Sequence, residues 1–211
     1  MWNLRRHDAE LVEDAVLWGM ASGPIVPPGS YQARLTLGDW SQTVDIQLVK
    51  DPRIDVSQAD LVAQYELATE IWETLSASHK ALGKIRDMRS QVEVLTERLE
   101  KAGYGDGIAE ISETIGEQLT SIEEKIYQTK NESSQDILNY PPRLDNKILD
   151  VMSGVQSADA APTDGAIELY SDLRNELDGY LAELDSVVGE EIAELNRLVR
   201  EKSAPAVLIP E

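Results

Sequence analysis

The sequence contains no cysteine, no phenylalanine and only two histidines among its 211 residues. The lack of cysteine excludes disulfides, thiolate catalysis and the usual structural zinc sites. His7 and His79 lie far apart in the chain, and neither has a histidine or carboxylate partner at the spacing of an HExxH metal site. We therefore expect both histidines at the surface or at an interface, and we assign no metal ligand.

Basic residues are scarce. The chain has 19 lysines and arginines against 39 aspartates and glutamates, which gives a net charge of -20. A field of this sign repels phosphate backbones and anionic membrane surfaces, so we expect neither nucleic acid nor a membrane as a partner. We interpret most carboxylates as the solvated faces of amphipathic helices, with adaptation to high salt and weak cation binding as alternatives.

Long apolar runs are also missing. No stretch approaches the length of a membrane span, and residues 1–6 lack the continuous apolar segment of a signal peptide. Either the chain is cytosolic or an exporting segment lies outside these 211 residues. The absence of cysteine does not decide between the two compartments, because a cysteine-free chain is compatible with both.

Motifs for catalysis or cofactor binding are absent too. The glycines at 103–107 lack the GxGxxG spacing and a preceding strand, and no GxxxxGK[ST] or DxDxDG pattern occurs. Carboxylate pairs such as Glu123-Glu124 and Glu190-Glu191 occur, and a glycosidase needs only two carboxylates about 5 to 9 Å apart. In a chain this acidic such pairs arise by chance. We assign no catalytic residue and no cofactor.

The dominant feature that is present is one long amphipathic helix, predicted from Ser57 to Gly103. Ser57 and Asp60 resemble a capping box, and Gly103 suits the left-handed residue that ends a helix. The helix would be about 65 Å long, and its apolar stripe requires antiparallel helical partners. That stripe repeats in steps of three and four at Ile71, Leu75, Leu82, Ile85, Val92, Leu95 and Leu99.

Three further helices follow with the same periodicity. A second, capped by Asp106, carries its stripe from Ile108 to Ile126, and a shorter third is marked by apolar residues from Leu144 to Val155. The fourth is predicted over about 163–202, alongside the first helix. The apolar tail at 206–210 is expected to pack on the end of the bundle or against the β part.

The first fifty-odd residues predict a different structure, a β-hairpin with one buried face. Apolar residues alternate with polar ones on both sides of Gly38-Asp39, at Tyr31, Ala33, Leu35, Leu37, Val44, Ile46 and Leu48. A hairpin is marginally stable alone, so this face needs covering by the helices or by missing chain. Residues 2–5 are predicted as a further strand and 7–22 as mostly loop. Trp2, Trp18 and Trp40 are expected to anchor a core here.

The proline in Asp51-Pro52-Arg53 ends the last strand. The fold class is therefore predicted as α+β, an antiparallel helical bundle with two long helices plus a small N-terminal antiparallel β piece. We place the domains at 1–55, a β module, and 56–211, the helical bundle.

Several segments together resemble a known family. Trp2-Asn3-Leu4-Arg5, Gly23-Pro24, the run from Pro28 to Leu35, and Asp51-Pro52-Arg53 are similar to the small Ig-like module of bacterial proteins that carry a sortilin-like BNR-repeat β-propeller. The run from Leu138 to Lys147, and Ser157-Ala158-Asp159 with Pro162-Thr163, resemble the helical C-terminal region of the same proteins. The motifs keep their order and cover nearly the whole chain.

The resemblance implies the C-terminal part of a larger exported protein, often labelled a glycosyl hydrolase because of its propeller. The family's ligand site would lie on the propeller, so no site residue is carried over. The strands that should precede residues 2–5 are missing, which indicates an excised piece or a split gene. We expect a partial Ig-like module at 1–55 on this basis.

Three functional hypotheses follow from these observations. The first is a non-catalytic accessory module that supports a propeller and offers its helical surface to a partner, either the parent's propeller domain or another protein. The second is a segment of a carbohydrate-active hydrolase that contributes to glycan binding or cleavage. The third is a module that self-associates through its helical seams.

Overall fold

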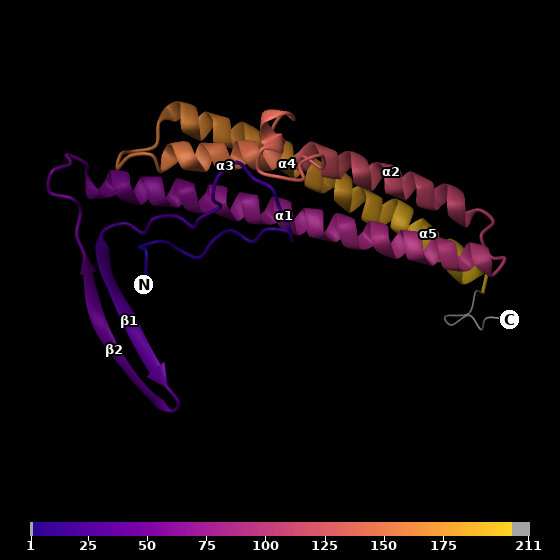
Figure 1. Cartoon of the computed structure of the whole chain (residues 1–211), viewed down its shortest axis with the longest axis horizontal. Coiled ribbons are helices and arrows are strands. Elements are labelled where there is room, and N and C mark those ends of the chain that lie inside the picture. Colours follow the sequence, from indigo (N-terminus) through magenta and orange to yellow (C-terminus); the bar gives the residue numbers. More distant parts are fainter. Residues whose placement is uncertain (1, 204–211) are drawn as a thin grey trace.

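The computed structural model describes residues 2–203 of the chain (Figure 1). Its β part is one antiparallel hairpin, and its remainder is helical, which confirms the predicted α+β class. The elements in chain order are β1 (Gly29–Leu37), β2 (Trp40–Leu48), α1 (Gln58–Lys101), α2 (Ile108–Ile126), a 3-10 turn (Asp136–Leu138), α3 (Leu144–Val155), α4 (Asp164–Val187), a π turn η2 (Val188–Ile192) and α5 (Ala193–Glu201).

The long helix α1 begins and ends as the sequence predicts. The Ser57 hydroxyl accepts a hydrogen bond from the Asp60 amide at 3.1 Å, and the Asp60 carboxylate accepts one from the Ser57 amide at 3.2 Å. This reciprocal pair is a capping box that satisfies two N–H groups at the start of the helix. Gly103 follows the helix with φ +76°, a backbone conformation that favours glycine.

The helices form three rods (Figure 1). The first rod is α1. The second rod consists of α2 and α3: α2 packs along the C-terminal half of α1 and α3 along its N-terminal half, and both run antiparallel to α1. The third rod is α4, η2 and α5, which packs on the other two and brings the two long helical stretches side by side. The predicted helix at about 163–202 is therefore helical throughout, with one π turn inside it.

One apolar core runs between the rods, and the predicted stripes line it. Ile71, Leu75, Leu82 and Ile85 of α1 are fully buried, as is Ile115 of α2. The predicted cap of α2 is wrong, because Gly107, with φ +73°, stands at that position and no side chain caps the helix. Among residues 2–203, no helix is long and apolar enough to cross a membrane.

The hairpin has the predicted register but not the predicted burial. Leu37 pairs with Trp40 across the turn, and Ala33 pairs with Val44. Figure 1 shows the hairpin extending away from the helices, attached at its base beside the start of α1. Nothing in the described part of the chain covers the outer part of its apolar face, where Leu35, Leu37 and Val44 are exposed. Of the two predicted covers for this face, the helices and missing chain, the structure rules out the helices. The prediction that Trp2, Trp18 and Trp40 anchor a core is wrong, since they are 45%, 57% and 52% exposed.

Residues 4–26 form an extended N-terminal strap over the bundle. Two arms of the strap run antiparallel, joined by hydrogen bonds from the Ala9 amide to Ala21 and from the Val26 amide to Leu4. The predicted strand at residues 2–5 is absent, because only an isolated bridge between Arg5 and Ile25 forms there. The predicted packing of the tail at 206–210 lies outside the described residues.

Candidate functional site

The hairpin presents one apolar face whose outer part no other described residue covers, while Tyr31 and Ile46 near its base are half-buried. We call this surface the hairpin face; it consists of Tyr31, Ala33, Leu35, Leu37, Trp40, Val44 and Ile46. Leu35 is 66% exposed, Leu37 78% and Val44 51%. An apolar strip of this length in water is typical of an interaction surface.

The opposite side of the hairpin is polar and is satisfied within the hairpin. Cross-strand hydrogen bonds run from Gln32 to Asp45 at 2.9 Å, from Ser30 to Gln47 at 2.8 Å and from Arg34 to Thr43 at 3.3 Å. Such cross-strand pairs stabilise a two-stranded sheet. The hairpin is therefore amphipathic, with one face that needs no partner and one that lacks a cover.

Contacts at its base fix the hairpin to the rest of the chain. The Gln58 amide group donates to the Pro28 carbonyl at 2.8 Å, and the Lys50 ammonium donates to the Val56 carbonyl at 2.7 Å. The rings of Trp2 and Tyr31 lie 5.7 Å apart. These contacts hold the base of the hairpin next to the N-terminus of α1 and leave its tip in solvent.

The strap is fastened to the bundle through its backbone amides rather than through a sheet. Five N–H groups donate to side chains of the helical part: Glu10 to Ser76 at 3.2 Å, Val12 to His79 Nδ1 at 3.3 Å, Val16 to the Tyr127 hydroxyl at 3.0 Å, Trp18 to Asn146 at 2.8 Å and Ile25 to Gln156 at 3.0 Å. Ala9 and Ala21, one in each arm of the strap, are buried against the core of the bundle. The strap obtains its backbone hydrogen bonds from these side chains, so it keeps one path without regular secondary structure.

A buried histidine and carboxylate meet beneath the strap. His79 Nε2 lies 3.6 Å from Asp145 Oδ2, and both side chains are almost fully excluded from solvent. The predicted surface or interfacial position of His79 is wrong. Burial lowers the pKa of His79 to about 4, assisted by the positive charge of Arg86, and burial raises the pKa of Asp145 to about 7. Each shift disfavours charge on the group concerned.

The acidic pairs singled out from the sequence do not converge on a cleft. The Glu123 carboxylate is buried and accepts from Arg86 Nε and Arg89 Nη1, each at 2.7 Å, so it joins α2 to α1. Glu124 points to solvent. Glu190 accepts from the Ser186 hydroxyl and Glu191 from the Gln118 side-chain amide. Glu123, Glu190 and Glu191 therefore have structural hydrogen-bond or ion-pair partners, and Glu124 is exposed.

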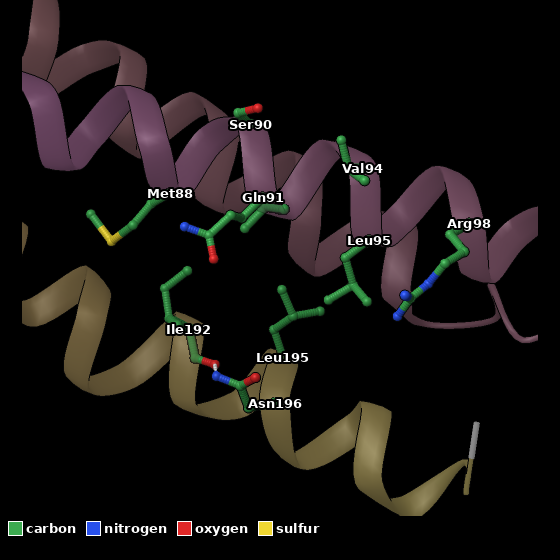
Figure 2. Close-up of a pocket in the computed structure, with 10 residues that line it drawn as sticks. Met88, Ser90, Gln91, Val94, Leu95, Arg98, Ile192, Leu195 and Asn196 are labelled. Atoms are coloured by element: carbon green, nitrogen blue, oxygen red, sulfur yellow. Dashed lines mark hydrogen bonds between the residues drawn. The ribbon is translucent and has the colours of Figure 1, made fainter. Parts of the chain in front are cut away.

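The groove between α1 and α5 has a volume of about 440 Å³ (Figure 2). Figure 2 shows Ile192 of η2 and Leu195 of α5 facing Met88 and Leu95 of α1, with Arg98 at one end. Its lining includes no histidine, aspartate or glutamate, so it lacks a general acid or base. In the described part of the chain, no group of three or more metal-ligating side chains is positioned to hold a metal ion.

Comparisons with protein-family models, with curated proteins and with solved structures give no match for this chain. The resemblance to the propeller-bearing proteins therefore stays a prediction from the sequence motifs. The candidate site rests on the structure alone, and its two parts are the hairpin face and the buried pair beneath the strap.

Proposed function

We propose that this chain is a non-catalytic accessory module that joins a β-rich partner domain by docking the hairpin face against the partner's sheet. The observation that carries the proposal is the exposure of this face, with Leu37 at 78%. By the sequence resemblance, the partner would be the remaining β part of a larger, exported, propeller-containing protein, and the three-rod bundle would serve as a rigid support.

The size of the face favours docking over permanent exposure. Two strands of nine residues present a surface of about 30 by 10 Å, or roughly 300 Å². Burying that much apolar surface contributes about 7 kcal/mol before the costs of association. The outer edges of β1 and β2 are unpaired in the two-stranded sheet, so a partner strand can also add to it by main-chain hydrogen bonds.

Charge favours a larger β domain over a second copy of this chain. Area does not separate the two, because packing the hairpin face on either partner buries roughly 600 Å² in total, about half of what a specific, stable interface requires. Two chains of charge -20 repel each other. The hairpin itself carries only three charged residues, Arg34, Asp39 and Asp45, so it is locally suited to an apolar partner.

The test co-expresses this chain with the β-rich domain encoded directly upstream of it and measures co-purification. Leu37→Asp places a charge on the hairpin face, whereas Thr36→Asp places the same charge on the polar face one residue away. We expect Leu37→Asp to reduce capture at least tenfold and Thr36→Asp to leave it unchanged.

Three results would count against the proposal. They are the lack of any β-rich domain encoded upstream, equal losses for the two variants, and a concentration-dependent dimer that Leu37→Asp abolishes. The last result, detected by light scattering, would mean that a second copy occupies the face.

A further inference from the structure

The geometry around His79 defines where the ring carries its proton. Nδ1 accepts the Val12 backbone N–H, so a neutral ring must hold its own proton on Nε2. Nε2 faces Asp145 Oδ2, the carboxylate oxygen that has no other hydrogen-bond partner among the described residues. Asp145 Oδ1 already accepts two N–H groups of Asn146, from the backbone at 2.7 Å and from the side chain at 3.2 Å. The pair therefore fits its surroundings when it holds one proton, on Nε2.

A second proton conflicts with this arrangement wherever it binds. On Nδ1, the proton meets the Val12 N–H, donor against donor. On Asp145 Oδ2, the second proton points at the Nε2–H of His79. That repulsion is relieved only if the ring proton moves from Nε2 to Nδ1, where it then points at the Val12 N–H. On Oδ1, it displaces the hydrogen bonds from Asn146. Asn146 in turn accepts from the Trp18 amide at 2.8 Å, so that route also disturbs the strap.

We propose that His79 and Asp145 form a proton-operated latch, which fastens the strap to α1 while the pair holds one proton and releases it at Val12 when the pair takes up a second. This inference is independent of the docking proposal above. The pKa of His79 is lowered by burial to about 4 from an ordinary 6.5, so the ring binds a proton more tightly once it is released, and a fall in pH below about 6.5 favours release of the strap.

Protons can reach the pair from solvent. His79 lies at the floor of an open hollow of about 570 Å³ between the strap and α1. The charged groups facing it are Lys80, Arg86 and Asp87 from α1, and Glu10, Glu13 and Asp14 from the strap. Lys80 pairs with Glu10 at 3.0 Å, and Arg86 pairs with Glu123 of α2. Tyr127, after α2, places its ring 6.3 Å from the imidazole, and Asp145 is the contribution of α3.

The first measurement uses the unmodified chain. Amide hydrogen exchange of Val12, corrected for the intrinsic pH dependence, is followed from pH 8 to pH 5 by NMR. We expect its protection to fall about fivefold to tenfold, the change that corresponds to loss of one buried hydrogen bond. The imidazole ¹⁵N shifts of His79 should indicate the Nε2–H form at pH 8. Amides of Leu119 and Leu177, both fully buried in the core, should keep their protection.

Two variants separate the latch from a merely structural contact. His79→Gln keeps an oxygen acceptor for Val12 and removes the titration, so protection should stay high and independent of pH. In Asp145→Asn, the backbone N–H of residue 146 orients the amide oxygen, so the amide NH₂ faces Nε2 and forces the ring proton onto Nδ1. Val12 should then be weakly protected at both pH values. His7→Gln, which changes the other histidine, should behave as the unmodified chain.

Several outcomes would overturn the latch. They are pH-independent protection of Val12 in the unmodified chain, an Nδ1–H imidazole at pH 8, normal protection in Asp145→Asn at pH 8, and loss of protection at Leu119 in parallel with Val12. The first, second and fourth need no variant, so the latch can be refuted even if a substitution prevents folding.

Discussion

The uncovered hairpin face leads to a matched comparison of two leucine-to-alanine substitutions. Leu82 of α1 is 0% exposed within the core, whereas Leu35 of β1 is 66% exposed on the hairpin face. Leu82→Ala removes buried methyl groups and leaves a cavity, which costs about 2–5 kcal/mol. Only a third of Leu35 is shielded from water, so Leu35→Ala loses about a third of the transfer free energy, or about 0.5 kcal/mol, and creates no cavity.

Urea denaturation followed by circular dichroism at 222 nm measures both free energies of unfolding by linear extrapolation. For a chain of this length, the Leu82→Ala loss corresponds to a fall in Tm of roughly 5 to 15 °C, against about 2 °C or less for Leu35→Ala. Each measurement is repeated at a tenfold higher protein concentration, which reveals any stabilisation by self-association.

A cost above about 2 kcal/mol for Leu35→Ala at both concentrations would refute the reasoning, because it would mean that part of the same chain buries the hairpin face. Docking to the proposed partner predicts the complementary result. In the assembled complex, Leu35→Ala should become clearly destabilising while the effect of Leu82→Ala stays the same.

Three further substitutions test the helical part. Glu123→Gln should lower the free energy of unfolding by about 3–5 kcal/mol in urea melts, because it leaves the partly buried guanidinium groups of Arg86 and Arg89 without their carboxylate, whereas the neighbouring, exposed Glu124→Gln should change it by less than about 0.5 kcal/mol. Ser57→Ala should cost about 1 kcal/mol by removing the capping box of α1, and a melt unchanged within error would contradict that role. The last test concerns pH. The folded pKa of His79, about 4, lies below its ordinary 6.5, so its contribution to stability is lost as pH falls from 6.5 toward 4. The folded pKa of Asp145, about 7, lies above 3.8, so its contribution is lost as pH rises from about 4 to 7. The two contributions change in opposite directions with pH. As pH falls from 7 to 4.5, the free energy of unfolding of His79→Gln should rise relative to that of the unmodified chain, and that of Asp145→Asn should fall. Differences that change with the same sign in urea melts would contradict the assignment.

The helices and the hairpin register could be predicted from the sequence because their determinants are local. Apolar steps of three and four along 71–99 define the buried side of α1, and the cap at Ser57 needs only the residue three positions later. Strict alternation on both sides of Gly38 sets the pairing of β1 with β2. Alternation indicates which face of a hairpin is apolar. It does not indicate whether the same chain covers that face, and the predicted burial by the helices was therefore wrong.

The strap and the buried pair depend on contacts distant in sequence, which periodicity does not report. The Glu10 amide binds a side chain 66 residues away, and the Trp18 amide binds one 128 residues away. A signal was nevertheless present in the helices. His79 falls four residues after Leu75 and three before Leu82, on the stripe that forms the core, and Asp145 precedes Ile148 and Met152 by three and seven residues on the stripe of α3.

A polar side chain on a buried stripe must find a partner, since burying it unpaired costs several kcal/mol. Two such interruptions on different helices indicate that polar groups meet inside the bundle. A proline- and glycine-punctuated segment without period, such as residues 7–28, is then the part of the chain whose backbone amides are free to meet them. The residues that interrupt the apolar pattern thus account for the path of the one segment that the pattern leaves unexplained. They also place His79, which accepts the Val12 amide of that segment, opposite the carboxylate that can control it.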